Sequence, residues 1–146
     1  MEGSELSNST ARLGLLLARV KKKMQKRMSE LLKPYGLTPE QRAILLALSE
    51  HAQMTQAHIS QVTSTEPSNL SVTLKRLMQK EYINRIDHPD DPRAYLIQLS
   101  QKGESIINEL LELSIFINKE LMEGIEQEEF NITYETLEKI DNNLNL

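Results

Sequence analysis

The sequence predicts a mainly helical protein with one small β hairpin (an α+β fold). Apolar residues recur every three or four positions over most of the chain, whereas 82–99 holds two short strand-like runs around a turn rich in Pro and Asp. With 146 residues, 39% of them hydrophobic, the chain is long enough for a packed core. No stretch contains the about 18 apolar residues that a membrane span needs, so we expect a cytoplasmic protein with no membrane partner.

The first two helices have clear end signals. Apolar residues on one face predict a helix over 10–33, which Pro34 and Gly36 end. Thr38 then begins a capping-box pattern, with a proline in the first turn and a glutamine three positions on. We therefore expect a second helix to about residue 50.

The next two helices are short and close together. Thr55 is a candidate cap for a third helix, and a fourth runs from about 66 to 80 with Pro67 in its first turn. The polar residues 63–65 separate them. Two short helices joined by a three-residue turn are typical of a helix-turn-helix, although the glycine often found in such a turn is absent.

A hairpin and two further helices complete the chain. The runs 82–87 and 94–99 predict the two strands, and Ser100 is a candidate cap for a helix that is apolar on nearly every face as far as Ile125. A last helix begins near Gln127. Few elements of so short a chain remain to cover the all-round apolar helix, so we expect a second copy of the chain to cover it.

Charge is unevenly distributed along the chain. Residues 1–99 carry 14 Lys and Arg against 10 Asp and Glu, whereas 100–146 carry 3 against 11. Such asymmetry indicates a part that faces nucleic acid joined to a part with another role. A cationic cluster in the first helix is interpreted as a solvated face, with a further DNA-binding patch as the alternative. Its members are Lys21, Lys22, Lys23, Lys26 and Arg27.

The fourth helix has two contrasting faces. Leu70, Leu74 and Leu77 form an apolar stripe that would anchor it. The opposite face holds hydroxyl, amide and cationic groups around one apolar residue, which suits the base edges and thymine methyls of the major groove. An ordinary solvated face has the same composition, and both interpretations stay open. The face comprises Ser68, Asn69, Val72, Lys75, Arg76 and Gln79.

The hairpin tip carries a single arginine. Arg93 lies close to Asp90 and Asp91 in a loop stiffened by two prolines. An arginine at such a tip fits a narrow minor groove, and the Asp91 carboxylate could orient its guanidinium. A surface ion pair at a turn is the alternative.

The composition disfavours enzymatic and metal-binding roles. The chain has no cysteine, and its three histidines (His51, His58 and His88) are dispersed. No nucleophile with a base and no Gly-rich phosphate loop is visible. We expect no catalytic residue, no metal and no cofactor.

The segment 91–103 resembles the wing signature of the MarR family of transcriptional regulators, an Asp-x-Arg followed by a strand that ends in Leu-Thr-x-x-Gly. The segments 37–45 and 70–83 resemble the family's second helix and its recognition helix leading into the wing. Ser100 replaces the usual threonine, which conserves the capping chemistry. Pro92 occupies a wing position where a second basic residue is common, and we expect this change to weaken phosphate contact.

The resemblance implies one MarR-like domain over 8–144. In it, 37–100 is a winged helix-turn-helix lobe, with the helix-turn-helix at 55–80 and the wing at 82–99. The helical dimerisation region comprises 8–36 and 101–146. The implied function is that of a bacterial, ligand-responsive repressor, a homodimer that binds a pseudo-palindromic DNA duplex.

The resemblance also implies roles for individual residues. Ser68, Asn69, Val72 and Arg76 are the groove-facing candidates, Lys75 a phosphate contact, Arg93 the wing contact and Asp91 its orienter. A small aromatic effector is a further implied partner, with Tyr35, Arg42 and His51 as candidates for its crevice and core or surface roles as their alternative.

A winged-helix module that binds other proteins instead of DNA is the competing hypothesis. It draws support from the balanced charge of 55–93, which holds five Lys and Arg and five Asp and Glu.

Overall fold

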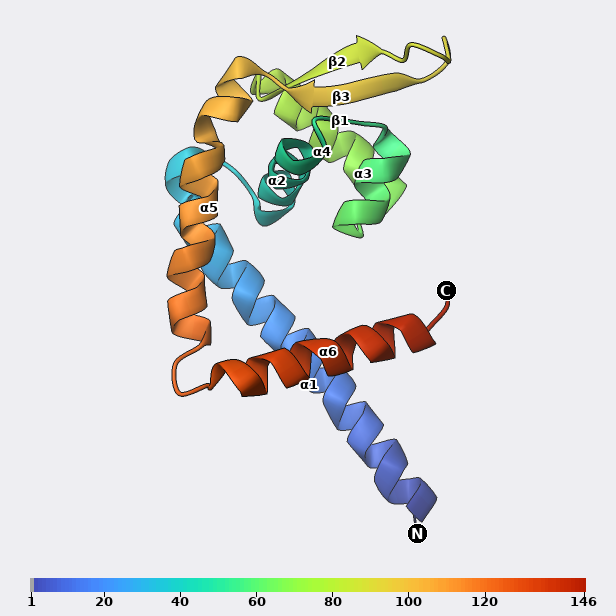
Figure 1. Cartoon of the computed structure of the whole chain (residues 1–146), viewed down its shortest axis with the longest axis vertical. Coiled ribbons are helices and arrows are strands. Elements are labelled where there is room, and N and C mark those ends of the chain that lie inside the picture. The colour runs from blue at the N-terminus through green and yellow to red at the C-terminus, as the bar shows by residue number, and fades with distance from the viewer. Residues whose placement is uncertain (1) are drawn as a thin grey trace. The chain divides into compact units, whose positions relative to one another are not determined.

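The computed structural model describes residues 2–146, apart from the side chains of Glu2 and Leu6, as six α-helices, one short 3-10 helix and three strands. The chain forms two compact units, of which the first ends at Leu113 and the second is Ser114–Leu146. The boundary falls inside helix α5 (Gln101–Leu121). The predicted class, mainly helical with a small antiparallel sheet, is confirmed (Figure 1).

Helix α1 (Glu2–Leu32) is followed by the 3-10 helix η1 (Lys33–Tyr35). Gly36 ends this segment with a φ of 64°, a left-handed conformation that glycine adopts without a steric penalty. The helix begins eight residues before the predicted start at residue 10, because its first turns are polar and lack the apolar spacing on which the prediction depended.

Helix α2 (Pro39–His51) begins with the predicted capping box. The Gln41 amide donates to the Thr38 hydroxyl at 3.1 Å, and the Thr38 amide donates to the Gln41 side chain at 3.1 Å. Helix α3 (Gln56–Thr63) is capped by Thr55, as predicted. Both helix starts are therefore set by local side-chain hydrogen bonds.

Helix α4 (Pro67–Gln79) follows α3 after three residues. Ser64 takes a φ of 51°, the left-handed position that a glycine often fills in such turns. Thr65 donates its amide to the Ser60 carbonyl at 3.1 Å and accepts the Ser60 hydroxyl on its own carbonyl at 2.5 Å. These hydrogen bonds hold the turn between the two helices without glycine.

The sheet has one strand more than the sequence predicted. Strands β2 (Ile83–Asp87) and β3 (Tyr95–Leu99) form the predicted hairpin, with Ile83 opposite Leu99 and Asp87 opposite Tyr95. The short strand β1 (Gln53–Met54) pairs antiparallel with the other edge of β3, which gives the order β1-β3-β2. The hairpin projects beyond α3 and α4 as a wing (Figure 1).

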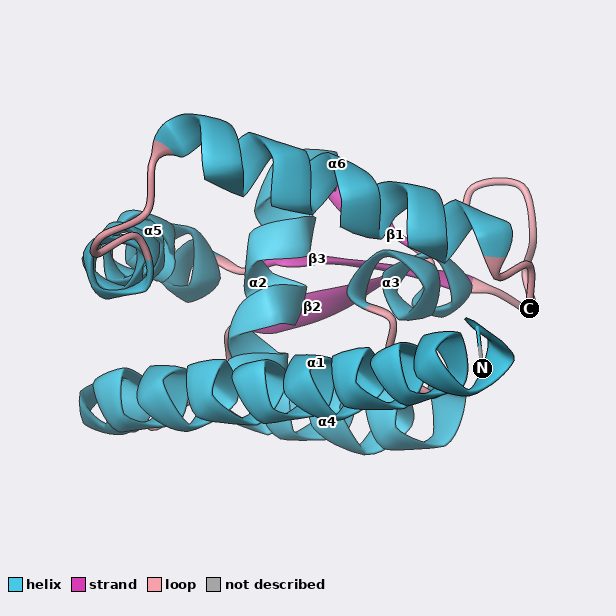
Figure 2. Cartoon of the chain, turned by 90° about the horizontal axis from the view of Figure 1, so that it is seen from below, coloured by secondary structure: helices cyan, strands magenta, loops and turns pink. Residues whose placement is uncertain are grey.

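The core of the first unit lies among α2, α3, α4 and the sheet, with α2 and α3 packed against β3 (Figure 2). The three leucines of the α4 stripe are buried, as predicted. The side chains that are less than 2% exposed are Leu32, Ile44, Leu45, Leu48, Met54, Ile59, Leu70, Leu74, Leu77, Ile97 and Leu110.

The second unit comprises the end of α5 and helix α6 (Gln127–Asn143). Helix α5 ends at Leu121, four residues before the Ile125 that the sequence placed in it, and Gly124 turns the chain with a φ of 72°. No residue of α6 is buried. Across residues 2–146, no helix is long and apolar enough to cross a membrane.

Candidate nucleic-acid interface

Helix α4 presents the predicted polar face to solvent. Its buried leucine stripe fixes the rotation of the helix about its own axis, because those side chains must face the core. The residues opposite are therefore exposed, including Val72, which is 51% exposed although it is apolar. An exposed valine among polar groups suits contact with a thymine methyl. The residues of the predicted face, all of them exposed, are Ser68, Asn69, Val72, Lys75, Arg76 and Gln79.

The wing tip is an ordered turn. The Asp91 carboxylate accepts the backbone amide of Arg93 at 2.9 Å, and the Asp91 carbonyl accepts the amide of Ala94 at 3.2 Å. The side chains of Asp91 and Arg93 are both exposed. Asp91 thus holds the backbone of Arg93. The sequence instead predicts that Asp91 orients the Arg93 guanidinium.

A chain of hydrogen bonds, which sequence reasoning missed, connects the wing to α4. The Tyr95 hydroxyl on β3 donates to the side-chain oxygen of Gln56 at 2.7 Å, and the Gln56 side-chain nitrogen donates to the Ser71 hydroxyl at 2.7 Å. Ser71 in turn donates to the Pro67 carbonyl at 3.2 Å. We call Tyr95, Gln56 and Ser71 the wing relay. It joins β3, the first turn of α3 and the exposed side of α4.

Arg85 lies beside the wing relay. Its guanidinium carbon is 3.6 Å from the centre of the Tyr95 ring, a cation–π contact that restrains an otherwise exposed side chain. This arginine is not among the site residues predicted from the sequence. Its place in a strand, where side chains alternate between the two faces, indicates only which face of the sheet it occupies. Alternation does not indicate that the arginine stacks on Tyr95.

The wing is also tied to the start of α5. The Ser100 hydroxyl accepts the Gly103 amide at 3.1 Å, which confirms the predicted cap, and donates to the Glu81 carbonyl at 2.6 Å. The Ser100 amide donates to the Tyr82 carbonyl at 3.0 Å. A Cβ atom on Gly103 would lie 2.2 Å from that carbonyl oxygen. The Ser-x-x-Gly segment is therefore the place where α5 packs tightly on the chain leading into β2.

The structure does not bring the three effector candidates together. The Arg42 Nε and Nη2 donate to the Leu110 carbonyl at 3.3 and 3.1 Å, and burial lowers the pKa of this guanidinium. Partial burial raises the pKa of the Tyr35 phenol, as does the hydrogen-bonded Glu109 carboxylate. The ring of His51 instead contacts that of His58, with centroids 5.2 Å apart.

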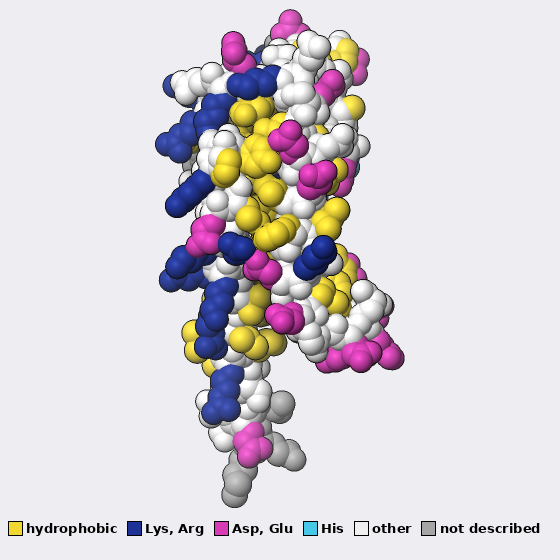
Figure 3. Space-filling model, turned by 90° about the vertical axis from the view of Figure 1, so that its left-hand side faces the viewer, with side chains coloured by type: hydrophobic (Ala, Val, Ile, Leu, Met, Phe, Trp, Pro, Cys, Tyr) yellow, Lys and Arg dark blue, Asp and Glu magenta, His cyan; other side chains and the backbone are white. Residues whose placement is uncertain are grey.

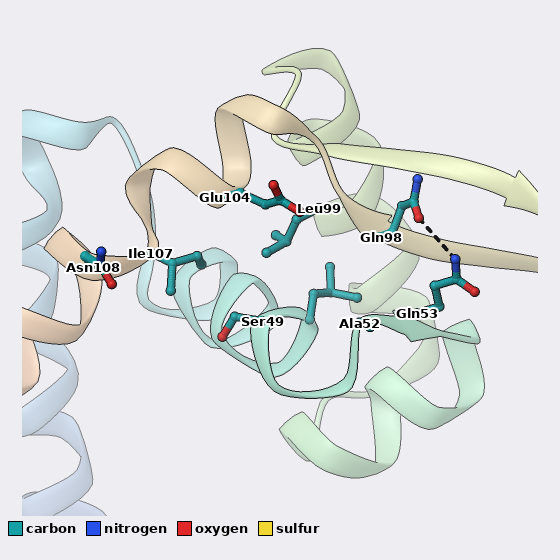
Figure 4. A pocket seen from close by; sticks show the side chains of 9 residues that line it. Ser49, Ala52, Gln53, Gln98, Leu99, Glu104, Ile107 and Asn108 are labelled. Atoms are coloured by element: carbon teal, nitrogen blue, oxygen red, sulfur yellow. Dashed lines mark hydrogen bonds between the residues drawn. The ribbon is translucent and has the colours of Figure 1, made fainter.

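A hollow of about 410 Å³ lies between the end of α2, strands β1 and β3 and the first turns of α5 (Figure 4). Gln53 donates its side-chain amide to Gln98 at 3.2 Å along one wall. Glu104 and Asn108 line the α5 side. None of the three effector candidates lines this hollow.

Comparison with known proteins agrees with the geometry. A family model described as "MarR family" matches residues 35–94, which span the helix-turn-helix and most of the wing. The multiple antibiotic resistance protein MarR of Escherichia coli is 29% identical over 110 residues, covering 75% of this chain and 76% of that protein. The transcriptional regulator SarZ of Staphylococcus epidermidis is 27% identical over 119 residues, covering 82% and 74%.

Solved structures extend the likeness to nearly the whole chain. A crystal structure of a mutant E. coli MarR complexed with operator DNA aligns with a TM-score of 0.85 and 25% identity over 91% of this chain and 96% of that one. These relatives are regulators and not enzymes, which confirms the prediction that the chain has a regulatory rather than a catalytic role. The chain is thus similar to the winged helix-turn-helix transcriptional regulators of the MarR family, in sequence over its helix-turn-helix and most of its wing and in structure over nearly its whole length.

Proposed function

We propose that this regulator acts as a cytoplasmic homodimeric repressor that binds a pseudo-palindromic DNA duplex through α4 and the wing. The observation that carries the proposal is the exposed polar face of α4, held beside an ordered wing that presents Arg93. Base contacts are assigned to Ser68, Asn69, Val72 and Arg76, a phosphate contact to Lys75 and the minor-groove contact to Arg93. The crystal structure of a relative complexed with operator DNA, which aligns with 91% of this chain, supports the proposal that the chain binds DNA.

Exposed apolar side chains support the dimer. One face of α1 displays five of them, each between 39% and 48% exposed. In the second unit Ile115, Phe116 and Ile132 are each more than half exposed. Side chains of this kind are costly to leave in water, and an obligate interface of about 2,000 Å² or more would cover them. The five on α1 are Leu13, Leu16, Leu17, Val20 and Met24.

The domain division follows from this proposal. The lobe at 37–100 contacts DNA, whereas 8–36 and 101–146 hold the dimer together. Two recognition helices related by a twofold axis would meet successive major grooves about 34 Å apart, which is why the target is a pseudo-palindrome.

A small aromatic effector remains part of the proposal. Tyr35 and Arg42 both reach α5 at neighbouring residues, Glu109 and Leu110, so a molecule entering there would disturb the join between the lobe and the dimerisation helices. His51 lies at the other end of α2 and is a weaker candidate. An effector changes DNA affinity only if it binds one spacing of the two DNA-binding lobes more tightly than another. The difference in binding free energy is commonly about 1–3 kcal/mol.

The experiment is selection from a random duplex library with the purified full chain, followed by titration of the enriched sequence at several salt concentrations. We expect a pseudo-palindrome, a dimer by light scattering and an affinity that falls as salt rises. Arg93→Ala should weaken binding about 10- to 100-fold. Lys139→Ala, which removes an exposed cation from α6, is the charge-matched control and should leave binding unchanged.

A winged-helix module that binds proteins is the second hypothesis, favoured by the balanced charge of residues 55–93. The same selection separates the two hypotheses. A dimer that enriches no duplex at low salt would contradict the repressor proposal and leave the protein-binding module.

A further inference from the structure

A hollow of about 670 Å³ lies beside α4. One wall is the flank of α4 that carries Asn69, Val72 and Arg76, and the opposite wall is α1, which contributes Lys21 and Gln25. The first turn of α2 and the turn of the helix-turn-helix form the rest of the lining. Part of the proposed DNA-reading surface thus faces a lysine from a helix that the family assignment places in the dimerisation region.

Helix α1 is strongly cationic. Between residues 6 and 29 it carries seven Lys and Arg and no Asp or Glu. Figure 3 shows Lys and Arg side chains in a row along this helix. From the sequence, one solvated cluster is expected, with the members Lys21, Lys22, Lys23, Lys26 and Arg27. The structure separates these residues by the direction that each one faces.

Successive residues of a helix point about 100° apart, so neighbouring lysines face different surroundings. Lys21 and Gln25 are four residues apart, share a face and both line the hollow. Lys22 and Lys23 are exposed but do not line it. Arg27 is paired with Glu30 at 3.1 Å. Lys21 is therefore the member of the cluster that lies across the hollow from the α4 residues.

We infer that Lys21 is a DNA phosphate contact, supplied by α1 to the backbone that flanks the major groove occupied by α4. This inference rests on the proposed DNA binding. A duplex docked on α4 places its sugar–phosphate backbone along the flanks of that helix. Lysine is a compact charge on a flexible four-carbon chain, which suits a phosphate that lies off the helix axis.

Two carboxylates line the hollow and would repel a DNA phosphate. Glu40 in the first turn of α2 and Glu66 at the start of α4 both line it, together with Lys21 and Arg76. Without Lys21 the hollow would hold more negative than positive side chains and would repel the backbone. Lys21 therefore matters more here than the same charge would on an open surface, and removal of the Glu40 charge should have the opposite effect.

The test compares three substitutions of equal charge in the full-length protein, Lys21→Ala, Lys22→Ala and Lys23→Ala, on the duplex selected above. We expect Lys21→Ala to weaken binding on the order of ten-fold, because a dimer loses two charge-assisted contacts. The slope of log affinity against log salt should fall by about 0.9 per half-site. Lys22→Ala and Lys23→Ala should match the wild type, and Glu40→Gln should bind more tightly.

Circular dichroism and light scattering on each variant show whether the helix and the dimer are intact. Equal weakening by all three lysine variants would overturn the inference, because a diffuse positive field would then account for the effect. Wild-type affinity and salt slope in Lys21→Ala would overturn it as well. If the wild type itself binds no duplex, the proposed function fails first, so the two failures are distinguishable.

Discussion

Replacement of Gly103 by alanine tests the join between the wing and α5. An alanine Cβ at this position would lie 2.2 Å from the Tyr82 carbonyl oxygen and 3.2 Å from a methyl carbon of Leu99. The close atom belongs to the backbone and also accepts the Ser100 amide, so it cannot move without weakening the start of α5. Relief of the overlap must separate α5 from the chain that leads into β2.

Two opposing effects set the magnitude. Alanine favours a helix over glycine by about 1 kcal/mol, which on its own would stabilise α5. Overpacking against fixed neighbours costs about 1–3 kcal/mol, and more when the neighbour is backbone. We therefore expect the free energy of unfolding to fall by up to about 2 kcal/mol, although the substitution improves helix propensity.

The assay is urea unfolding followed by circular dichroism at one fixed protein concentration, because the stability of a dimer depends on concentration. Gly14→Ala is the matched control, since this glycine also lies in a helix but has no neighbouring atom within 4 Å of the position of an added Cβ. The control should gain up to about 1 kcal/mol. If Gly103→Ala were as stable as Gly14→Ala, the packing explanation of the signature glycine would be refuted.

Three further outcomes are expected. Tyr95→Phe removes the hydroxyl that joins the wing to α3 and should weaken operator binding by about 1 kcal/mol. Tyr134→Phe in α6 is the control and should leave operator binding unchanged. Equal affinities of the two variants in a binding titration would show that the wing relay does not contribute to DNA binding. Val20→Asp places a charge on the exposed apolar face of α1 and should yield monomers by light scattering, and an unchanged dimer mass would contradict the proposed interface. Because partial burial and Glu109 raise the pKa of Tyr35 above its unfolded value, its contribution to stability is present below about pH 10 and is lost as pH rises through the folded pKa. In urea unfolding above about pH 10, the free energy of unfolding should therefore fall more steeply with pH in the wild type than in Tyr35→Phe. Equal slopes for the two proteins would contradict the raised pKa of Tyr35.

The fold was largely predictable where hydrogen bonds are local. Thr38, Thr55 and Ser100 each cap the helix that follows, because a side-chain oxygen and the amides that it accepts lie within three residues of one another. The leucine stripe of α4 was predictable for a related reason, since helical periodicity places those side chains on one face before any packing occurs. The exposed polar face of α4 follows from the same periodicity.

Strand β1 was not predictable. It has two residues, too few for a pattern, and Gln53 pairs with Gln98, a residue 45 positions later. The wing relay has the same character, because Gln56 receives a hydrogen bond from Tyr95 and gives one to Ser71. No spacing in a sequence encodes contacts between three separate elements.

The sequence by itself determined where the helices after α1 begin, which face of α4 is polar and which family the wing motif resembles, because each depends on residues within a few turns of one another. Tertiary structure alone decided that Asp91 holds the Arg93 backbone and that Lys21, among three consecutive lysines, faces the hollow beside α4. Composition gives these lysines the same charge, whereas the direction of each side chain depends on how α1 packs against the rest of its unit. That packing is set by contacts between distant parts of the chain.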